Sequence, residues 1–271
     1  MTFKILKLRR WDDIHVIARR RQWLFRGHRD TQWHLETALE RTFRREAIPA
    51  ARRMDVEAEL LRDFQRAYHQ YGAHVPEPHA HLEWLSLMQH HGAPTRLLDF
   101  SYSIYVAAYF ALETADSDCA VLAINGPWAV RQSVAALKTK DAHGLARLTG
   151  RTSREQEGEA YKACFLEPFV SCVYPLNPFR LNDRLRTQKG LFVIPGDMRL
   201  SFMDNLAALP GYRSPANVVK IIIPKAMRRE ALEQLFSMNV SRTSLFPGLD
   251  GYASSLGIYH PAFRGDDWTI P

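Results

Sequence analysis

Hydrophobic and polar positions along the chain follow helical and strand periods in turn. Residues 52–71 place apolar side chains every three or four positions with charges between them, which predicts an amphipathic helix. Residues 81–91 predict a second helix, and residues 103–112 a third whose apolar positions run nearly all round, as in a buried helix. Short apolar runs predict strands at residues 3–8, 22–27, 119–124, 169–174, 190–194 and 217–223.

The order of these elements predicts an α+β fold. Further helices are expected near residues 11–20 and at residues 225–236, and strands and helices do not alternate strictly. We therefore expect a central mixed or antiparallel sheet surrounded by helices, in a single domain over residues 1–271. The segment 126–165 is interpreted as a helical, basic and exposed insertion into that domain.

Composition narrows the class of protein. The 271 residues, 46% hydrophobic and 24% charged, are typical of a globular chain with a core of its own. No apolar run is long enough for a bilayer span, and the first residues lack the apolar core of a signal peptide. With only three cysteines, we expect a cytoplasmic protein with free thiols and no membrane partner.

The chain carries a formal net charge of +7, which favours an anionic partner such as nucleic acid or a nucleotide. The basic residues of the middle segment are Arg131, Lys138, Lys140, Arg147, Arg151 and Arg154.

Four short polar motifs interrupt the apolar pattern, and the first is Phe25-Arg26-Gly27-His28. An arginine at the end of a strand can direct a planar, two-pronged donor at a carboxylate or a phosphate. Gly27 would let a ligand approach the backbone closely. An ion pair at a turn is the structural alternative for Arg26.

The second motif is the stretch QHHGAPTRLLDFS, which contains Gln89, His90, His91, Thr95, Arg96, Asp99 and Ser101. Asp99 or Ser101 stands where the N-cap of the following helix would lie. An ion pair between Arg96 and Asp99 would pin the intervening strand. Adjacent histidines on a helix point to different sides, so no metal site is expected.

The third and fourth motifs lie in the second half of the chain. Thr187 to Phe192, TQKGLF, is a polar loop that feeds a strand, and it is either a plain junction or a ligand contact. In Ser244 to Gly251, SLFPGLDG, one proline and two glycines force a turn. Asp250 would cap a helix at residues 252–257 or act as a catalytic acid or base.

Taken in order, these four motifs resemble the FRG domain family, from Gln22 to about Leu256. The usual central pattern of that family is Q-H-[YF]-G-x-P-T-R-L-L-D followed by an A-L-Y-F-A helix. This chain departs from the pattern at two positions, with His91 at the usual aromatic position and Ala108 in place of leucine.

The chain is also distantly similar to ADP-ribosyltransferases. That resemblance implies a related fold, NAD as substrate and no metal. Arg26 would match the first motif of those enzymes, and Leu98 to Ser101 with the helix at 106–111 the second, although Asp99 departs from the usual Ser/Thr pattern. In the last part of the chain, Asp250 is the only carboxylate held between a defined turn and the start of a predicted helix.

The polar motifs and the resemblance together give roles to particular residues, with Thr95, Arg96 and Asp99 organising a site that Arg26, His90 and Asp250 line. Catalytic roles fall on Arg26, His90 and Asp250, and NAD-binding roles on Arg26, Gly27, His28, Thr95, Arg96, Asp99, Phe100, Ser101 and Tyr105. Arg26 would hold the NAD phosphates, and Phe100 or Tyr105 would stack on nicotinamide.

The resemblance thus implies an NAD-dependent ADP-ribosyltransferase that modifies nucleic acid or protein. An antitoxin partner and a role in a toxin–antitoxin or phage-defence system extend it by analogy. Two alternatives stay open. One is a non-catalytic or nuclease-like nucleic-acid-binding module. The other is a ligand sensor or structural module in which Arg26, Arg96 and Asp99 form a buried ion-pair network.

Overall fold

A computed structural model gives the arrangement of the chain in space. It describes residues 4–72, 75–138, 161, 165–166, 169–178 and 183–259.

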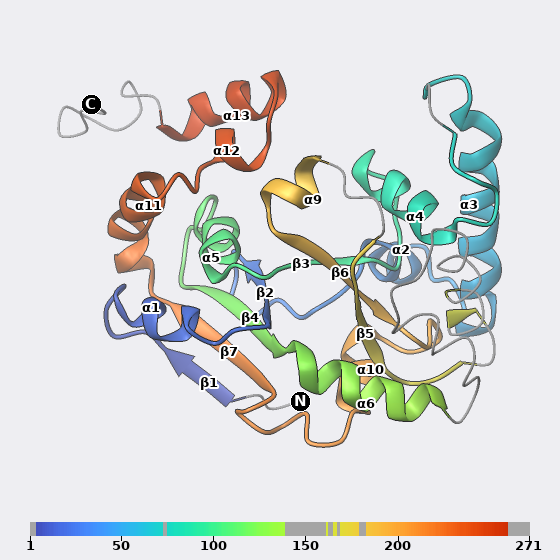
Figure 1. Ribbon diagram of the computed structural model, residues 1–271, viewed down its shortest axis with the longest axis horizontal. Coiled ribbons are helices and arrows are strands. Elements are labelled where there is room, and N and C mark those ends of the chain that lie inside the picture. Colours follow the sequence, from blue (N-terminus) through green and yellow to red (C-terminus); the bar gives the residue numbers. More distant parts are fainter. Residues whose placement is uncertain are drawn as a thin grey trace.

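One seven-stranded sheet forms the centre of the molecule, with the strand order β1-β7-β4-β2-β3-β6-β5 (Figure 1). The strands are β1 Lys4–Lys7, β2 Trp23–His28, β3 Leu98–Ser101, β4 Cys119–Asn125, β5 Val173–Leu176, β6 Gly190–Pro195 and β7 Val218–Ile223. β1 and β7 run parallel, and the other neighbours run antiparallel. The predicted α+β class with a mixed sheet is confirmed.

Helices pack around this sheet. They are α1 Asp13–Ala18, α2 Ala38–Arg45, α3 Arg53–Tyr68, α4 His81–His90, α5 Ile104–Leu112, α6 Gly126–Lys138, α9 Asp183–Thr187, α10 Phe202–Ala207, α11 Arg228–Ser237, α12 Arg242–Leu245 and α13 Leu249–Tyr259. Two 3-10 turns, Ala50–Arg52 and Lys225–Met227, precede α3 and α11.

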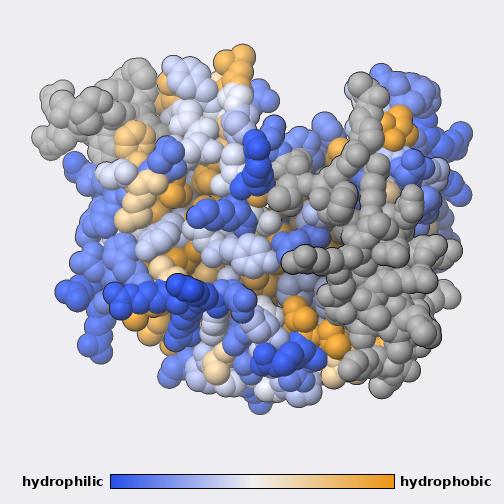
Figure 2. Space-filling view, in the orientation of Figure 1, coloured by the Kyte–Doolittle hydropathy of each residue, from blue (hydrophilic) through white to orange (hydrophobic). Residues whose placement is uncertain are grey.

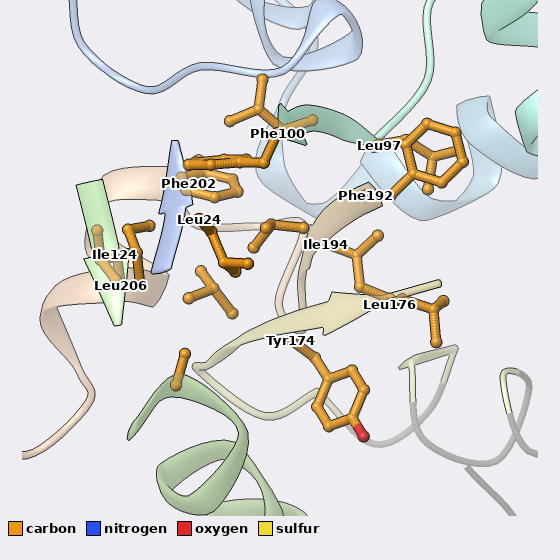
Figure 3. Packing of buried hydrophobic residues seen from close by; sticks show 14 of the residues in the cluster. Leu24, Leu97, Phe100, Ile124, Tyr174, Leu176, Phe192, Ile194, Phe202 and Leu206 are labelled. Carbon is orange, nitrogen blue, oxygen red and sulfur yellow. The ribbon is translucent and has the colours of Figure 1, made fainter. Parts of the chain in front are cut away.

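Each face of the sheet buries its own apolar cluster. On one face, α1, α5 and α11 pack against alternate residues of β2, β4 and β7. On the other face, α4, α6 and α10 pack against the intervening residues and against β5 and β6. Figure 3 shows this second cluster, which includes Phe100 of β3 and Phe202 of α10. The two-residue period of the strands therefore divides the core into two layers.

Several predicted elements shift in the structure. The strand expected at residues 169–174 forms at Val173–Leu176, because its pairing with β6 begins at Val173 opposite Pro195. α13 begins at Leu249, earlier than the expected residue 252. α2, α9, α10 and α12 were not predicted, since each is short and its apolar pattern covers few turns.

The predicted basic insertion is described in part. α6 confirms a helix at its start, but Trp128, Ala129 and Leu137 are buried, so one face of that helix belongs to the core. Arg131 is exposed on α6. The Lys138 side chain and Lys140, Arg147, Arg151 and Arg154 lie outside the described residues.

The surface seen in Figure 2 is largely hydrophilic outside its grey segments, with apolar residues in small patches. None of the helices in the described ranges combines the length and apolar character that crossing a bilayer requires.

Candidate functional site

The sheet opens between β2 and β3. β2 pairs with β4 at six positions, from Trp23 opposite Asn125 to His28 opposite Ala120. It pairs with β3 at Phe25 opposite Ser101 only. Beyond that position the Arg26 side chain crosses the opening, and its terminal Nη1 donates a hydrogen bond of 2.6 Å to the carbonyl oxygen of Asp99.

Two cavities meet at this opening, and Arg26 and Gly27 line both of them. We call the larger one, of about 890 Å³, the large chamber. It is lined by Arg26, Gly27, His28, Gln32, Trp33, His34, Leu35, Glu36, Glu40, Arg41, Arg44, Ser201 and Met203. The other, of about 210 Å³, is the small chamber. It is lined by Phe25, Arg26, Gly27, Asp99, Phe100, Ser101, Val106, Ala107, Phe110, Arg184 and Gln188.

Gly27 serves the packing of α5 on β2. A Cβ atom at this position would lie 2.0 Å from the carbonyl oxygen of Ala107 and 2.7 Å from the backbone nitrogen of Ala111. Because both contacts are with backbone atoms of a helix, no side chain fits. The sequence predicted that Gly27 lets a ligand approach the backbone closely. The structure shows a further reason for a glycine at this position, which is the close packing of α5 on β2.

The Arg26 guanidinium is held in an environment that disfavours its charge. Burial lowers the pKa of Arg26, while the nearby Asp99 carboxylate opposes that shift. Its Nε is buried and has no hydrogen-bond partner in the described part of the chain. A buried donor without a partner is costly in a folded protein, so this N–H group is a natural contact for an anionic ligand.

The second, third and fourth motifs join beside the small chamber. The Ser101 hydroxyl donates to the carbonyl oxygen of Gln188 at 2.7 Å. The Gln188 amide in turn donates to the carbonyl oxygen of Leu245 at 3.1 Å, and the Thr187 hydroxyl approaches the same oxygen at 3.3 Å. These hydrogen bonds join three segments that are far apart in sequence beside the small chamber, which Arg26 also lines, and α9 contacts α12 there (Figure 1).

The fourth motif contributes an aromatic ring to this corner. Phe246 meets the ring of Phe110 edge to face at 5.8 Å, and the Arg184 guanidinium stacks over it at 4.9 Å. Gly251 makes this turn possible, since a Cβ there would lie 1.8 Å from the carbonyl oxygen of Phe246.

The large chamber holds two groups with perturbed protonation. Burial, helped by the nearby charge of Arg26, lowers the pKa of His28 to about 3, so the ring is neutral at physiological pH. Burial raises the pKa of Glu40, whose Oε2 accepts a hydrogen bond of 3.1 Å from the backbone N–H of Phe202. Glu36 is bound by both Nε and Nη2 of Arg44 at 3.1 Å. Glu40 is therefore the large-chamber carboxylate without an ion-pair partner among the described residues.

The structure brings together part of the predicted site. Arg26, Gly27, His28, Asp99 and Ser101 line one or both chambers. Phe100 also borders the small chamber, but its side chain belongs to the apolar core and is 3% exposed, so it cannot offer a face to a ligand (Figure 3).

Arg96 and Thr95 take structural positions, contrary to their expected roles in NAD binding. The Arg96 side chain is 0% exposed, with Nε 2.8 Å from both carboxylate oxygens of Glu57 on α3 and Nη1 donating to the carbonyl oxygen of Phe165. The expected ion pair with Asp99 is therefore wrong, and Glu57 is the partner. The Thr95 hydroxyl is buried and donates to the Gln89 side chain at 2.5 Å.

Tyr105, His90 and Asp250 lie outside both chambers. The Tyr105 hydroxyl reaches His15 on α1 at 2.8 Å, so this ring faces away from Arg26. His90 is exposed at the end of α4. Asp250 is exposed in the first turn of α13, one residue inside the helix instead of capping it. The expected cap at Asp99 or Ser101 is wrong as well, because the Ser103 side chain caps α5.

Residues that the sequence left unassigned complete the site. Arg184, Gln188 and Phe110 line the small chamber, Phe246 stands behind it, and Trp33 and Glu40 line the large one. Gln188 and Phe246 fell within polar motifs, so their segments carried a signal although the residues themselves did not. Among the described residues, no group of three or more His, Cys, Asp or Glu side chains is placed to hold a metal ion.

Comparison with known proteins gives one match. Residues 21–119 match the FRG domain family. The matched range contains the first two motifs and most of the large chamber, whereas the third and fourth motifs lie beyond it. The chain matches no curated protein and no solved structure.

Proposed function

Because the chain carries an FRG domain over residues 21–119, we propose that this domain, with the segments packed on it, binds NAD and transfers ADP-ribose to a macromolecule. The reaction breaks the bond between the nicotinamide nitrogen and the ribose carbon. A nucleophilic oxygen or nitrogen of the acceptor bonds to that carbon, and nicotinamide leaves with the bonding electron pair.

The observation that carries the proposal is the position of Arg26 where the two chambers meet. Its guanidinium has a buried Nε without a partner in the described residues, and its Nη1 is fixed on the Asp99 carbonyl. A rigid, partly unsatisfied guanidinium suits the pyrophosphate in the middle of a dinucleotide. The halves of NAD would then extend into the chambers on either side.

The size and walls of the cavities support the same ligand class. The large chamber, about 890 Å³, falls in the range of small-molecule sites. Trp33 borders it, and Phe110 borders the small chamber, so each half of a dinucleotide would have an aromatic neighbour.

Glu40 is our candidate for the acid–base group. It borders the large chamber, and burial raises its pKa, which makes the carboxylate a stronger proton acceptor. In the proposed reaction Glu40 accepts the proton that the acceptor nucleophile loses. The net charge of +7 favours nucleic acid over protein as that acceptor. A toxin or defence role stays an extension by resemblance.

The test is incubation of the purified protein with labelled NAD and separate pools of RNA, DNA and protein. Arg26→Gln, Glu40→Gln and the exposed control Arg62→Gln are run in parallel, with circular dichroism to check folding. We expect label on one acceptor class with the wild type and Arg62→Gln. Arg26→Gln should lose NAD binding, whereas Glu40→Gln should bind NAD and lose at least about a hundredfold in transfer.

Two outcomes count against the proposal. If the wild type does not bind NAD in calorimetry, under conditions in which a control enzyme does, the proposal is wrong. Binding to RNA or DNA that weakens steeply with salt and ignores NAD would replace it with the nucleic-acid-binding module.

A further inference from the structure

The small chamber presents a hydrogen-bond acceptor and a hydrogen-bond donor on its wall. The Asp99 carboxylate accepts no hydrogen bond from any residue that the structure describes. The Arg184 guanidinium has no carboxylate partner among those residues, and its stacking on Phe246 holds it in place. A neutral ligand with one N–H donor and one carbonyl acceptor would satisfy both groups.

The remaining walls favour a flat ring. Val106, Ala107 and Phe110 of α5 and Phe25 of β2 supply apolar surface, and the chamber holds about 210 Å³. This is too little for a nucleoside with its phosphates, and it suits a single ring with one small substituent. Donor, acceptor and apolar walls together describe an aromatic carboxamide.

We propose that the small chamber binds the nicotinamide ring of NAD, with Asp99 accepting from the carboxamide N–H and Arg184 donating to its carbonyl oxygen. This inference rests on the proposed function and adds the orientation in which NAD binds. Arg26 then lies at the pyrophosphate, and the adenosine half occupies the large chamber. The nicotinamide ribose lies where the two chambers meet, so the acceptor reaches it from the large chamber, which Glu40 lines. Asp99 and Arg184 become specificity residues for the leaving group.

The charge of Asp99 gives this arrangement a measurable signature. A carboxylate in place of the carboxamide would lose the N–H that Asp99 accepts and would face Asp99 at close range, where like charges repel strongly. Arg184 binds an oxygen of either ligand, so the two ligands differ mainly at Asp99. The wild-type protein should therefore reject nicotinic acid and nicotinic acid adenine dinucleotide, which carry that carboxylate. Asp99→Asn removes the repulsion and keeps the side-chain size.

The experiment measures affinities by calorimetry for NAD, nicotinic acid adenine dinucleotide and ADP-ribose, and by ligand-observed NMR for free nicotinamide and nicotinic acid. The proteins are the wild type, Asp99→Asn, Arg184→Met and the exposed control Asp63→Asn. We expect the wild type and Asp63→Asn to prefer the amide over the acid by at least about tenfold in each pair. Asp99→Asn should reduce that preference to about twofold or less, and both site variants should keep the ADP-ribose affinity.

Each outcome decides the inference. Arg184→Met gives an independent reading, because it should weaken binding of nicotinamide and NAD without affecting ADP-ribose. Equal binding of amide and acid by the wild type, together with ADP-ribose binding, overturns the inference and leaves the proposed function standing. Nicotinamide binding that depends on Asp99, without ADP-ribose binding, supports the inference and defeats the proposed function. Binding of none of the five ligands removes both.

Discussion

At the scale of the residue, burial keeps the His28 side chain neutral in the folded protein. His28 is 5% exposed, its Nδ1 has no partner among the described residues, and its pKa is lowered to about 3. In the unfolded chain its pKa returns to about 6.5. The folded state therefore excludes a proton that the unfolded state binds between these two values.

This difference predicts a loss of stability in acid. Above about pH 6.5 both states are neutral at His28, and as the pH falls toward 3 the free energy of unfolding drops by up to about 1.4 kcal/mol per pH unit. His28→Gln lacks this contribution. Urea unfolding at about pH 7.5 and about pH 5 should show the wild type losing about 2 kcal/mol more than the variant. Equal losses would show that the histidine titrates normally in the folded protein.

Asp250 provides a second test at the same scale. Its side chain is exposed on α13 and borders neither chamber. Asp250→Asn should therefore change NAD binding and ADP-ribose transfer by less than about twofold, as for other exposed positions. Labelled-NAD assays beside Glu40→Gln check this, and a loss in Asp250→Asn as large as in Glu40→Gln would return the catalytic role to Asp250.

At the scale of the element, the contact between β2 and α5 depends on Gly27. Gly27→Ala would place a methyl group 2.0 Å from the Ala107 carbonyl, and the backbone of a buried helix cannot move away cheaply. We expect a loss of about 3 kcal/mol in the free energy of unfolding. Gly92→Ala is the comparison, because it has open space and a φ of +86°, and should cost only about 1 kcal/mol. Chemical denaturation of both variants measures the difference, and similar costs would contradict the close packing.

The ion pair between Arg96 and Glu57 joins the strand segment before β3 to α3. Glu57→Gln leaves the fully buried guanidinium without its carboxylate, which typically costs about 3–5 kcal/mol. The double variant Arg96→Met, Glu57→Leu should recover most of that loss, since no charge stays buried. Thermal unfolding of the wild type, Glu57→Gln and the double variant checks this, and a double variant no more stable than Glu57→Gln would contradict the buried pair.

At the scale of the molecule, the candidate site is assembled from β2, β3, α2, α5 and α9, with α12 behind it. A ligand that fills both chambers should slow amide hydrogen exchange in residues 183–189 and 242–246 together with residues 23–28. At about a hundred times its dissociation constant it should add about 2.7 kcal/mol to the free energy of unfolding. Protection confined to residues 23–28 would show that the small chamber is not part of the ligand site.

The amino-acid pattern alone was enough to predict the elements with a strong period and the segments that carry polar chemistry. α3, α4, α5 and the strands β2, β4, β6 and β7 form close to where their apolar patterns place them. The four polar motifs also indicated the right regions, because Arg26, Asp99, Ser101, Gln188 and Phe246 all lie at or beside the small chamber. Local periodicity and turn residues are properties of neighbouring positions, so they can be read without the fold.

The roles of the individual polar residues depend on long-range packing. Arg96 and Arg26 look alike in the sequence, yet Arg96 is paired with Glu57, 39 residues away, while Arg26 crosses the opening in the sheet. Asp250 follows a turn that its proline and glycines define, but that turn places Phe246 beside the site and leaves Asp250 exposed. The partner of a buried charge and the wall of a cavity come from distant segments. Long-range packing sets both, and a local pattern does not specify them.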